Sequence, residues 1–335
     1  MNTSNSMDAI NPVMSVKKKS KGFKFLIVCL ILLAVGIAIA AIGAALGGIR
    51  PISIGPGGFH VYSLEDLREV TTINKTFHNV KNIELNVAVF TTVEFVEGDG
   101  FSVKGQNQKM HGQLLAKEKD GTLEIYTEDR TRSKWGGFTL TPWINFDGNT
   151  SHITITYPKG VKLENVRIDT DVVSDLSLNN LTCKSLELTT SVSDVKMNTI
   201  DADEMTIRMN TGDIHADRVS AGAIDIESSI GEVSFSRTNV QSLSTNVNTG
   251  DFEFSGKILG DSYLDVDIGD IDMELDQSED MLGLILNVSV GDVRINGQEV
   301  GSKYHRSVAS SAKNLQTANL TIDANVSEVR IKFLG

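Results

Sequence analysis

Acidic side chains recur at a fixed spacing, and they form the pattern in this sequence with the clearest chemical potential. Each acidic residue follows Gly or Ser and precedes an apolar residue, as in Thr-Gly-Asp-Ile at 211. The acidic members are Asp175, Asp194, Asp213, Glu232, Asp251, Asp270, Asp292 and Glu328. The first five intervals are each 19 residues, and the next two are 22 and 36. Carboxylates repeated along one face could collect calcium, because calcium prefers oxygen ligands.

The same carboxylates can instead stabilise the bends in which they lie. The calcium-binding nonapeptide repeat needs a Gly-Gly-x-Gly-x-Asp spacing, which this sequence lacks. A short acidic side chain can accept hydrogen bonds from the backbone N–H groups of its own bend. We therefore expect the eight acidic residues to be structural corners and expect no metal site, with weak calcium binding as the alternative.

Catalytic chemistry has less support. Hydrolysis of a glycan needs two or three converging acids or bases in a cleft. Asp265, Asp267, Asp270 and Asp272 alternate on one outward face, a pattern typical of a solvated surface. The histidines have no metal-ligand spacing and are His60, His78, His111, His152, His215 and His305. We expect no catalytic residues and no cofactor, while a polysaccharide-acting enzyme is the alternative.

One aromatic and basic segment is the better candidate for a binding site. It contains both tryptophans of the chain within an otherwise acidic, aromatic-poor sequence. The candidate residues are Arg130, Arg132, Lys134, Trp135, Phe138, Trp143 and Phe146. Exposed aromatic rings beside arginines are typical anchors for a partner. The alternative is that these rings pack onto the rest of the domain as a cap.

Alternating apolar residues show which elements carry these groups. Leu284, Leu286, Val288 and Val290 occupy every second position, which buries one face of a β-strand. Two residues separate Val290 from Val293, so the chain must bend there to return the next apolar residue to the inside. A period of 19 residues fits a coil of a β-solenoid, in which coils stack ~4.8 Å apart and form a core together.

The pattern predicts an all-β fold: one β-solenoid domain over residues 76–335. Residues 76–163 read as irregular early coils with a loop at 129–150. Residues 164–335 read as regular repeats, with a loop or cap insertion at 297–317. Residues 50–75 are rich in glycine and proline at their start and predict a linker followed by a possible N-terminal cap, including a short helix.

An uncharged segment precedes this domain. Phe25 to Ile49 contain no charged residue and lie between Lys24 and Arg50, which predicts a transmembrane helix over residues 23–49 that contacts the lipid bilayer. The lysines before it place residues 1–22, a disordered segment, in the cytoplasm and the solenoid outside, as a single-pass cell-membrane protein. A cleaved signal peptide is the alternative.

Charge limits the partners of the C-terminal domain. From Arg50 onward the chain has 26 basic and 42 acidic residues, a difference of −16. Nucleic acid and anionic lipid would be repelled from this part, whereas cationic partners are favoured. Cys29 and Cys183 cannot pair if one lies in the membrane segment and the other in the repeats, so we expect no disulfide.

Three motifs carry a family resemblance. They are the Thr-Gly-Asp-Ile type repeats, the opening segment 77–85 and the closing segment 320–331. Together they resemble a bacterial domain-of-unknown-function family whose members are described as candidate adhesins, over roughly residues 76–333. The resemblance implies a right-handed β-solenoid, often tied to the membrane of Gram-positive bacteria and to envelope stress, without catalytic residues. Ser174, Ser193 and Ser327 replace the corner glycine and should affect only turn geometry.

These observations lead to one functional expectation and two alternatives. We expect a non-enzymatic, membrane-anchored surface protein, either adhesin-like or accessory to envelope stress. Its partner would be an envelope protein, a glycan or a cationic peptide. The alternatives are a polysaccharide-acting enzyme on a β-helix and a purely structural, self-assembling surface protein.

Overall fold

The computed structural model describes most of the C-terminal domain. The described residues are 36, 52–55, 58–61, 69–108, 111–128, 138–140, 151–308 and 317–335. The predicted cytoplasmic segment, nearly all of the predicted membrane helix and the predicted short helix lie outside them. No helix among the described residues is both long and apolar enough to cross a membrane.

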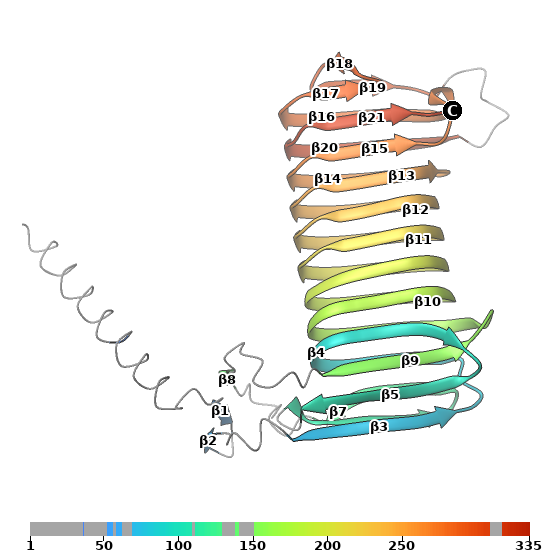
Figure 1. Ribbon diagram of the computed structural model, residues 1–335. Helices are drawn as coiled ribbons and strands as arrows, with labels where there is room; N and C mark the ends of the chain where they lie inside the picture. The colour runs from blue at the N-terminus through green and yellow to red at the C-terminus, as the bar shows by residue number, and fades with distance from the viewer. Residues whose placement is uncertain are drawn as a thin grey trace, which may run out of the picture.

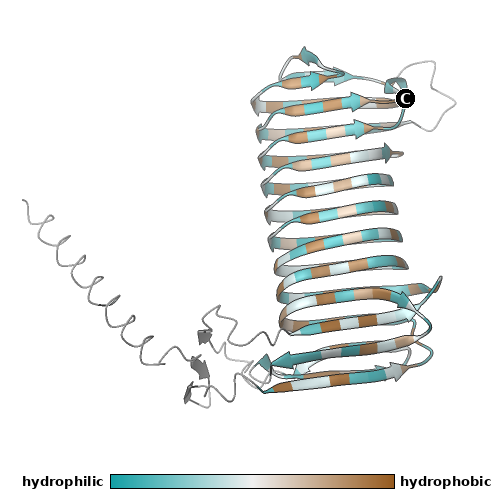
Figure 2. Ribbon diagram, in the orientation of Figure 1, coloured by the Kyte–Doolittle hydropathy of each residue, from teal (hydrophilic) through white to brown (hydrophobic). Residues whose placement is uncertain are grey.

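Stacked coils of β-structure make up the main body of the molecule (Figure 1). One sheet contains 18 strands, and its coils run parallel to one another through most of the stack. The all-β fold and the stacking of coils predicted from the repeat are confirmed. Apolar and polar residues alternate along the strands in Figure 2, and the apolar ones form the buried core between the walls of the stack.

The regular coils lie in three long strand segments, β10 (Lys162–Thr211), β11 (Ile214–Ile230) and β12 (Val233–Thr249). Each residue pairs with the residue 19 positions away in the next coil, as Val195 pairs with Ile214 and Ile214 with Val233. Equivalent apolar side chains therefore stack in columns inside the solenoid.

Glycine is required at the first corner of each regular coil by a close approach of backbones. The φ angles of Gly212, Gly231, Gly250 and Gly269 lie between 126° and 148°. A Cβ atom on any of them would lie only 1.8 to 2.0 Å from the carbonyl oxygen of the corner in the neighbouring coil. The serine corners differ in geometry, because neither Ser193 nor Ser327 has a positive φ.

A second corner follows in each coil and uses left-handed backbone angles. Asn180, Thr199, Arg218 and Arg237 lie 19 residues apart and have φ angles between 51° and 59°. In the next coil the register shifts by one residue, so that Gly256 lies opposite Thr238, with a φ of 145°. Left-handed angles suit Asn and Gly but are uncommon for Thr and Arg.

The final coil of the chain is inserted out of sequence. After β12 the strands are β13 (Phe252–Ile258), β14 (Ser262–Ile268), β15 (Ile271–Leu275), β16 (Leu282–Val290), β17 (Val293–Ile295), β20 (Ala318–Val326) and β21 (Val329–Phe333), with a short 3-10 helix at Glu279–Met281. β20 pairs with β14 on one side and β16 on the other. β21 likewise lies between β15 and β17. The C-terminal coil is therefore not the end of the stack.

The predicted insertion at 297–317 contributes the end of the stack. β18 (Gln298–Val300) pairs antiparallel with β17, and β19 (Lys303–Arg306) pairs antiparallel with β16. Asn296 and Gly297 form the two-residue turn between β17 and β18, with φ angles of 49° and 78° that match a type I′ hairpin. The described part of the insertion thus acts as a cap; residues 309–316 lie outside the described residues.

The opposite end mixes parallel and antiparallel pairing. Its strands are β3 (Val70–Phe77), β4 (Asn82–Gly98), β5 (Phe101–Gln108), β6 (Gln113–Lys119), β7 (Thr122–Glu128) and β9 (His152–Pro158). β4 pairs parallel with β7, β9 and β10, whereas β3–β5, β5–β9 and β6–β7 are antiparallel. These coils are irregular because hairpins interrupt the winding.

Two predicted connections contain strands. β1 (Ile52–Gly55) and β2 (Gly58–Val61) lie where we predicted a linker, and β8 (Phe138–Leu140) lies within the predicted loop 129–150. They pair antiparallel in a separate sheet of order β2-β1-β8. Ile52 and Ile54 alternate with small residues, a strand pattern that the neighbouring glycines and prolines obscured.

Candidate functional site

A charged groove of about 830 Å³ crosses five neighbouring strands near the C-terminal end of the stack. The strands are β12, β13, β15, β21 and β17, which lie side by side in this order. Their inward side chains, including Phe235, Phe254 and Met273, belong to the core. Their outward side chains border the groove, because successive residues of a strand point to opposite faces.

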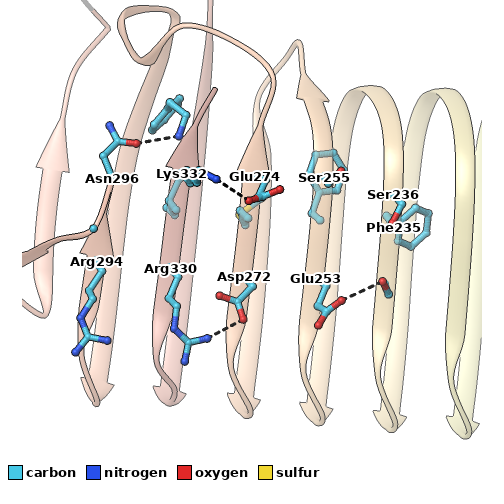
Figure 3. A pocket seen from close by; sticks show the side chains of 16 residues that line it. Phe235, Ser236, Glu253, Ser255, Asp272, Glu274, Arg294, Asn296, Arg330 and Lys332 are labelled. Atoms are coloured by element: carbon cyan, nitrogen blue, oxygen red, sulfur yellow. Dashed lines mark hydrogen bonds and ion pairs between the residues drawn. The ribbon is translucent and has the colours of Figure 1, made fainter. Parts of the chain in front are cut away.

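The outward side chains form two rows along the solenoid axis (Figure 3). The first row runs from β12 to β17 through Ser234, Glu253, Asp272, Arg330 and Arg294. The second row runs through Ser236, Ser255, Glu274, Lys332 and Asn296. Hydroxyl groups therefore lie at one end of the groove, carboxylates in the middle and basic groups at the other end.

The basic groups are paired with carboxylates. The Arg330 guanidinium lies 2.7 Å from Asp272 and 2.7 Å from Glu328, with Asp270 at 3.4 Å. Hydrogen bonds to Glu328 and Asp272 raise the pKa of Arg330, and the hydrogen bond from Arg330 lowers the pKa of Glu328. Lys332 pairs with Glu274 at 3.0 Å. These pairs hold the inserted β21 against β15.

Glu253 differs from the other carboxylates of the groove. The Ser234 hydroxyl donates a hydrogen bond to its carboxylate at 3.3 Å, and among the residues that the structure describes no basic side chain forms an ion pair with it. Ser234, Ser236 and Ser255 leave open space beside it, because their side chains are short. This end of the groove can accept an amine or other cation at Glu253 and can exchange hydrogen bonds through the serine hydroxyls.

The corner carboxylates have a structural contact, but not the one we predicted. The Asp213 carboxylate accepts a hydrogen bond from the backbone N–H of Glu232 at 2.9 Å, and Asp251 accepts one from Asp270 at 2.8 Å. Asp270 in turn accepts one from Glu328 at 3.0 Å. Each of these carboxylates binds the corner of the next coil in space rather than its own corner. The N–H groups of stacked corners lie along the solenoid axis, which explains the difference.

Other candidate residues lie apart from the groove. Asp175 pairs with Lys196 at 3.2 Å in an earlier coil. The aromatic segment lies outside the described residues, except for the backbone of Phe138 in β8. No group of three or more potential metal ligands occurs in the part of the chain that the structure describes. Cys183 is buried, and burial raises the pKa of its thiol to about 12.

The sequence reasoning assigned Asp272 to a solvated surface and missed the other groove residues. They lie two and four positions after the acidic corners, where strand alternation alone shows that they point outward. Nothing in the motif distinguishes Glu253 or Ser255 from any other solvated side chain. Contact between residues 272 and 330 also depends on the inserted coil, which the order of repeats does not reveal.

One protein-family model and several solved structures match this chain. The model of the Toastrack DUF4097 family matches residues 80–332. Solved structures that resemble the chain include a candidate adhesin from Bacteroides fragilis, at 11% identity and a TM-score of 0.43, covering 80% of this chain and 98% of that one. A candidate lipid-binding protein from Parabacteroides distasonis has 11% identity and a TM-score of 0.40, with 80% and 98% covered. No curated protein matches.

Proposed function

This chain belongs to the Toastrack DUF4097 family, and we propose that it is a non-enzymatic, adhesin-like binding protein of the cell surface. The observation that supports this proposal is the charged groove, in which Glu253 accepts a hydrogen bond from a hydroxyl and pairs with no basic side chain of the described residues. We infer that the groove binds a cationic group of a surface ligand. An acidic chain with a net charge of −12 favours the approach of such a ligand.

The ion pairs of the groove support binding rather than catalysis. Asp272 and Glu274 each pair with a basic side chain, at 2.7 Å and 3.0 Å. A carboxylate held in this way is less available to transfer a proton or attack a sugar than one in an apolar pocket. Glu253 is then the single carboxylate of the two rows that can meet an incoming cation without first breaking an ion pair.

Antiparallel strands at both ends of the stack disfavour the self-assembling alternative. β18 and β19 are only three and four residues long, and they lie over the last parallel coil. The antiparallel pairs β3–β5 and β6–β7 occupy the other end. Short or hairpin edges reduce strand pairing between molecules.

The membrane location belongs to the same proposal. The uncharged segment 23–49 would hold the chain in the cell membrane, with the lysine-rich N-terminus in the cytoplasm and the solenoid outside. An epitope tag after Gly335 should then be accessible to antibody on intact cells, whereas a tag before Met1 should be accessible only after permeabilisation. The opposite pattern would exclude this orientation.

Binding can be measured with the full-length chain in detergent micelles. Two amine-bearing probes, hexalysine and a chitosan hexamer, should bind the wild type. Glu253→Gln should weaken binding by about tenfold or more, because a hydrogen bond to a charged group contributes about 1.5–3 kcal/mol. Glu227→Gln is the matched control, because Glu227 is exposed in a row that continues into β14, away from the groove.

Two results would count against the proposed site. Equal weakening by Glu253→Gln and Glu227→Gln would show that only the overall acidity attracts the probes. Wild-type binding of neither probe would remove the groove as a cation site.

A further inference from the structure

A second hollow lies on the same wall of the solenoid and continues the charged groove. It has a volume of about 540 Å³ and is lined by Lys196, His215, Ala216, Asp217, Ser234, Ser236 and Arg237. We call it the basic hollow. Ser234 and Ser236 line both spaces, so the two form one track along the solenoid axis. The first row of the groove extends through His215, which pairs in register with Ser234, and through Lys196, which pairs with His215.

Three basic groups, Lys196, Arg218 and Arg237, meet two carboxylates at the basic hollow, with Asp175 beside Lys196 at 3.2 Å and Asp217 beside both arginines. Arg237 donates from Nε to Asp217 at 2.8 Å, and the Arg218 guanidinium lies 2.7 Å from the same carboxylate. Two guanidinium groups therefore share one carboxylate. The Arg237 and Lys196 side chains are 65% and 59% exposed, so both can reach a ligand from solvent. Guanidinium groups bind carboxylates and phosphates well because of their planar donor geometry.

The backbone beneath these arginines is in an unfavourable conformation. Arg218 and Arg237 have φ angles of 56° and 51°, whereas Asn180, a residue type that suits such an angle, occupies an equivalent corner. A non-glycine residue held at a left-handed corner carries backbone strain. Basic side chains at these corners are therefore present despite the local backbone preference. Strain of this kind is common where a side chain has a role in binding.

We propose that the track binds a linear glycan that carries both anionic groups and amines. The anionic group lies over Lys196 and Arg237, the sugar hydroxyls contact Ser234 and Ser236, and the amine lies at Glu253. This inference rests on the proposed function, because it assigns the ligand of the same groove and adds a second half to it.

The spacing of the coils favours a glycan over a peptide. Coils stack ~4.8 Å apart, which is similar to the length of one sugar in an extended glycan, so successive sugars can meet equivalent positions in successive coils. An extended peptide advances ~3.3 Å per residue and loses this register within a few residues. From Lys196 in β10 to Glu253 in β13 is three coils, or about 14 Å. An acid and an amine on sugars three positions apart, as an alternating glycan provides, match this separation.

The experiment compares four hexasaccharides on the full-length chain in detergent micelles by calorimetry. One alternates glucuronate with unsubstituted glucosamine and carries both charges. The others are a chitosan hexamer with amines only, a galacturonate hexamer with carboxylates only, and an N-acetylated chitin hexamer with neither. The alternating hexamer should bind about tenfold tighter than either singly charged hexamer, as expected for one added charge-assisted contact.

Two variants separate the halves of the track. Arg237→Asn removes the guanidinium and keeps a residue type that tolerates the left-handed angle. It should lower the affinity for the alternating hexamer to that for the amine-only hexamer, and it should leave the affinity for the amine-only hexamer unchanged. Glu253→Gln should weaken both. Arg208→Gln is the matched control, because Arg208 lies in a row that continues into β14, away from the track, and pairs with Asp225 and Glu227.

The failures of the two proposals are distinguishable. If the amine-only hexamer binds as tightly as the alternating one, and Arg237→Asn changes neither, the glycan proposal is wrong while the cation site at Glu253 stands. If Glu253→Gln affects no hexamer, both proposals are wrong. Tighter binding of hexalysine than of every hexasaccharide would also overturn the glycan assignment in favour of a peptide.

Discussion

The regular coils and the C-terminal end follow the same local rules but differ in the order of stacking. In β10 to β12 each coil stacks on the coil that precedes it in sequence, with a constant offset of 19 residues. At the C-terminal end, β20 and β21 lie between coils that are earlier in the chain. The repeat therefore specifies the shape of a coil but not its neighbour, because every coil presents similar apolar columns.

The cap explains how the out-of-sequence order is fixed. β19 pairs with one edge of β16 and β18 with one edge of β17. These antiparallel strands occupy the outer side of that coil, so only its inner side can accept β20 and β21. Arg330 then forms ion pairs with Asp272 of the neighbouring coil and with Glu328 of its own coil. Substitutions that disturb the stacking should therefore produce the largest differences in stability between the two regions.

Gly250→Ala should have the largest effect, because it acts on the close contact between regular coils. The added Cβ would lie 2.0 Å from the carbonyl oxygen of Gly231, at a φ of 144°. Overpacking and backbone strain together should cost about 3 kcal/mol or more in the free energy of unfolding. Urea denaturation checks this value.

Gly297→Ala in the cap is the matched comparison. Gly297 has a φ of 78° but no atom within 4 Å of its added Cβ, so only strain remains and the cost should be about 1 kcal/mol. Equal losses for the two variants would show that backbone angle, and not contact between coils, determines the need for glycine.

Leu320→Ala tests the inserted coil and should have the next largest effect. Leu320 is fully buried between Ser262 of β14 and Leu284 of β16, and truncation of such a leucine costs about 2–5 kcal/mol. Hydrogen exchange should then increase across residues 282–306 as well, because β16 and β17 reach the rest of the stack through this coil.

Leu243→Ala provides the control for that measurement. Leu243 is equally buried in β12, within the regular coils. Its truncation should leave the protection of residues 282–306 nearer to that of the wild type. Retained protection there in Leu320→Ala would contradict a dependence of the end coil on the inserted one.

The sequence predicted the structure of each coil but not the order in which the coils stack. Alternation and glycine corners predicted the strands and bends, because burial and positive φ act within a few residues. The inserted position of β20 and β21 depends on competition among similar coil faces, so no local pattern indicates it. The charged groove was missed for the same reason, since Asp272 and Arg330 meet only through that insertion. The left-handed corner at Arg218 was missed because the residue type opposes it.

Thr199→Asn should produce a smaller effect of the opposite sign. Thr199 is β-branched and has a φ of 59°, so asparagine should fit this corner of the regular coils better. The hydroxyl of Thr199 accepts a hydrogen bond from Arg218 Nε at 3.1 Å, and its loss offsets part of the gain. We expect the free energy of unfolding to rise by about 0.5 kcal/mol, measured by urea denaturation. Any decrease would show that this contact outweighs the backbone strain.

Acidification should give the smallest difference between the two regions. Hydrogen bonds from Arg330 lower the pKa of Glu328 at the inserted coil, and a hydrogen bond from Arg237 lowers the pKa of Asp217 in the regular coils. Each depressed pKa contributes stability that is present above the ordinary values of 4.5 and 3.8 and is lost as pH falls through the folded pKa. Both carboxylates are near solvent, which screens the effect. Glu328→Gln should therefore flatten the loss of hydrogen-exchange protection with falling pH at residues 282–306, while Asp217→Asn should flatten it at residues 195–237. If either variant altered both regions equally, the two carboxylates would be acting through net charge rather than through the coils that they join.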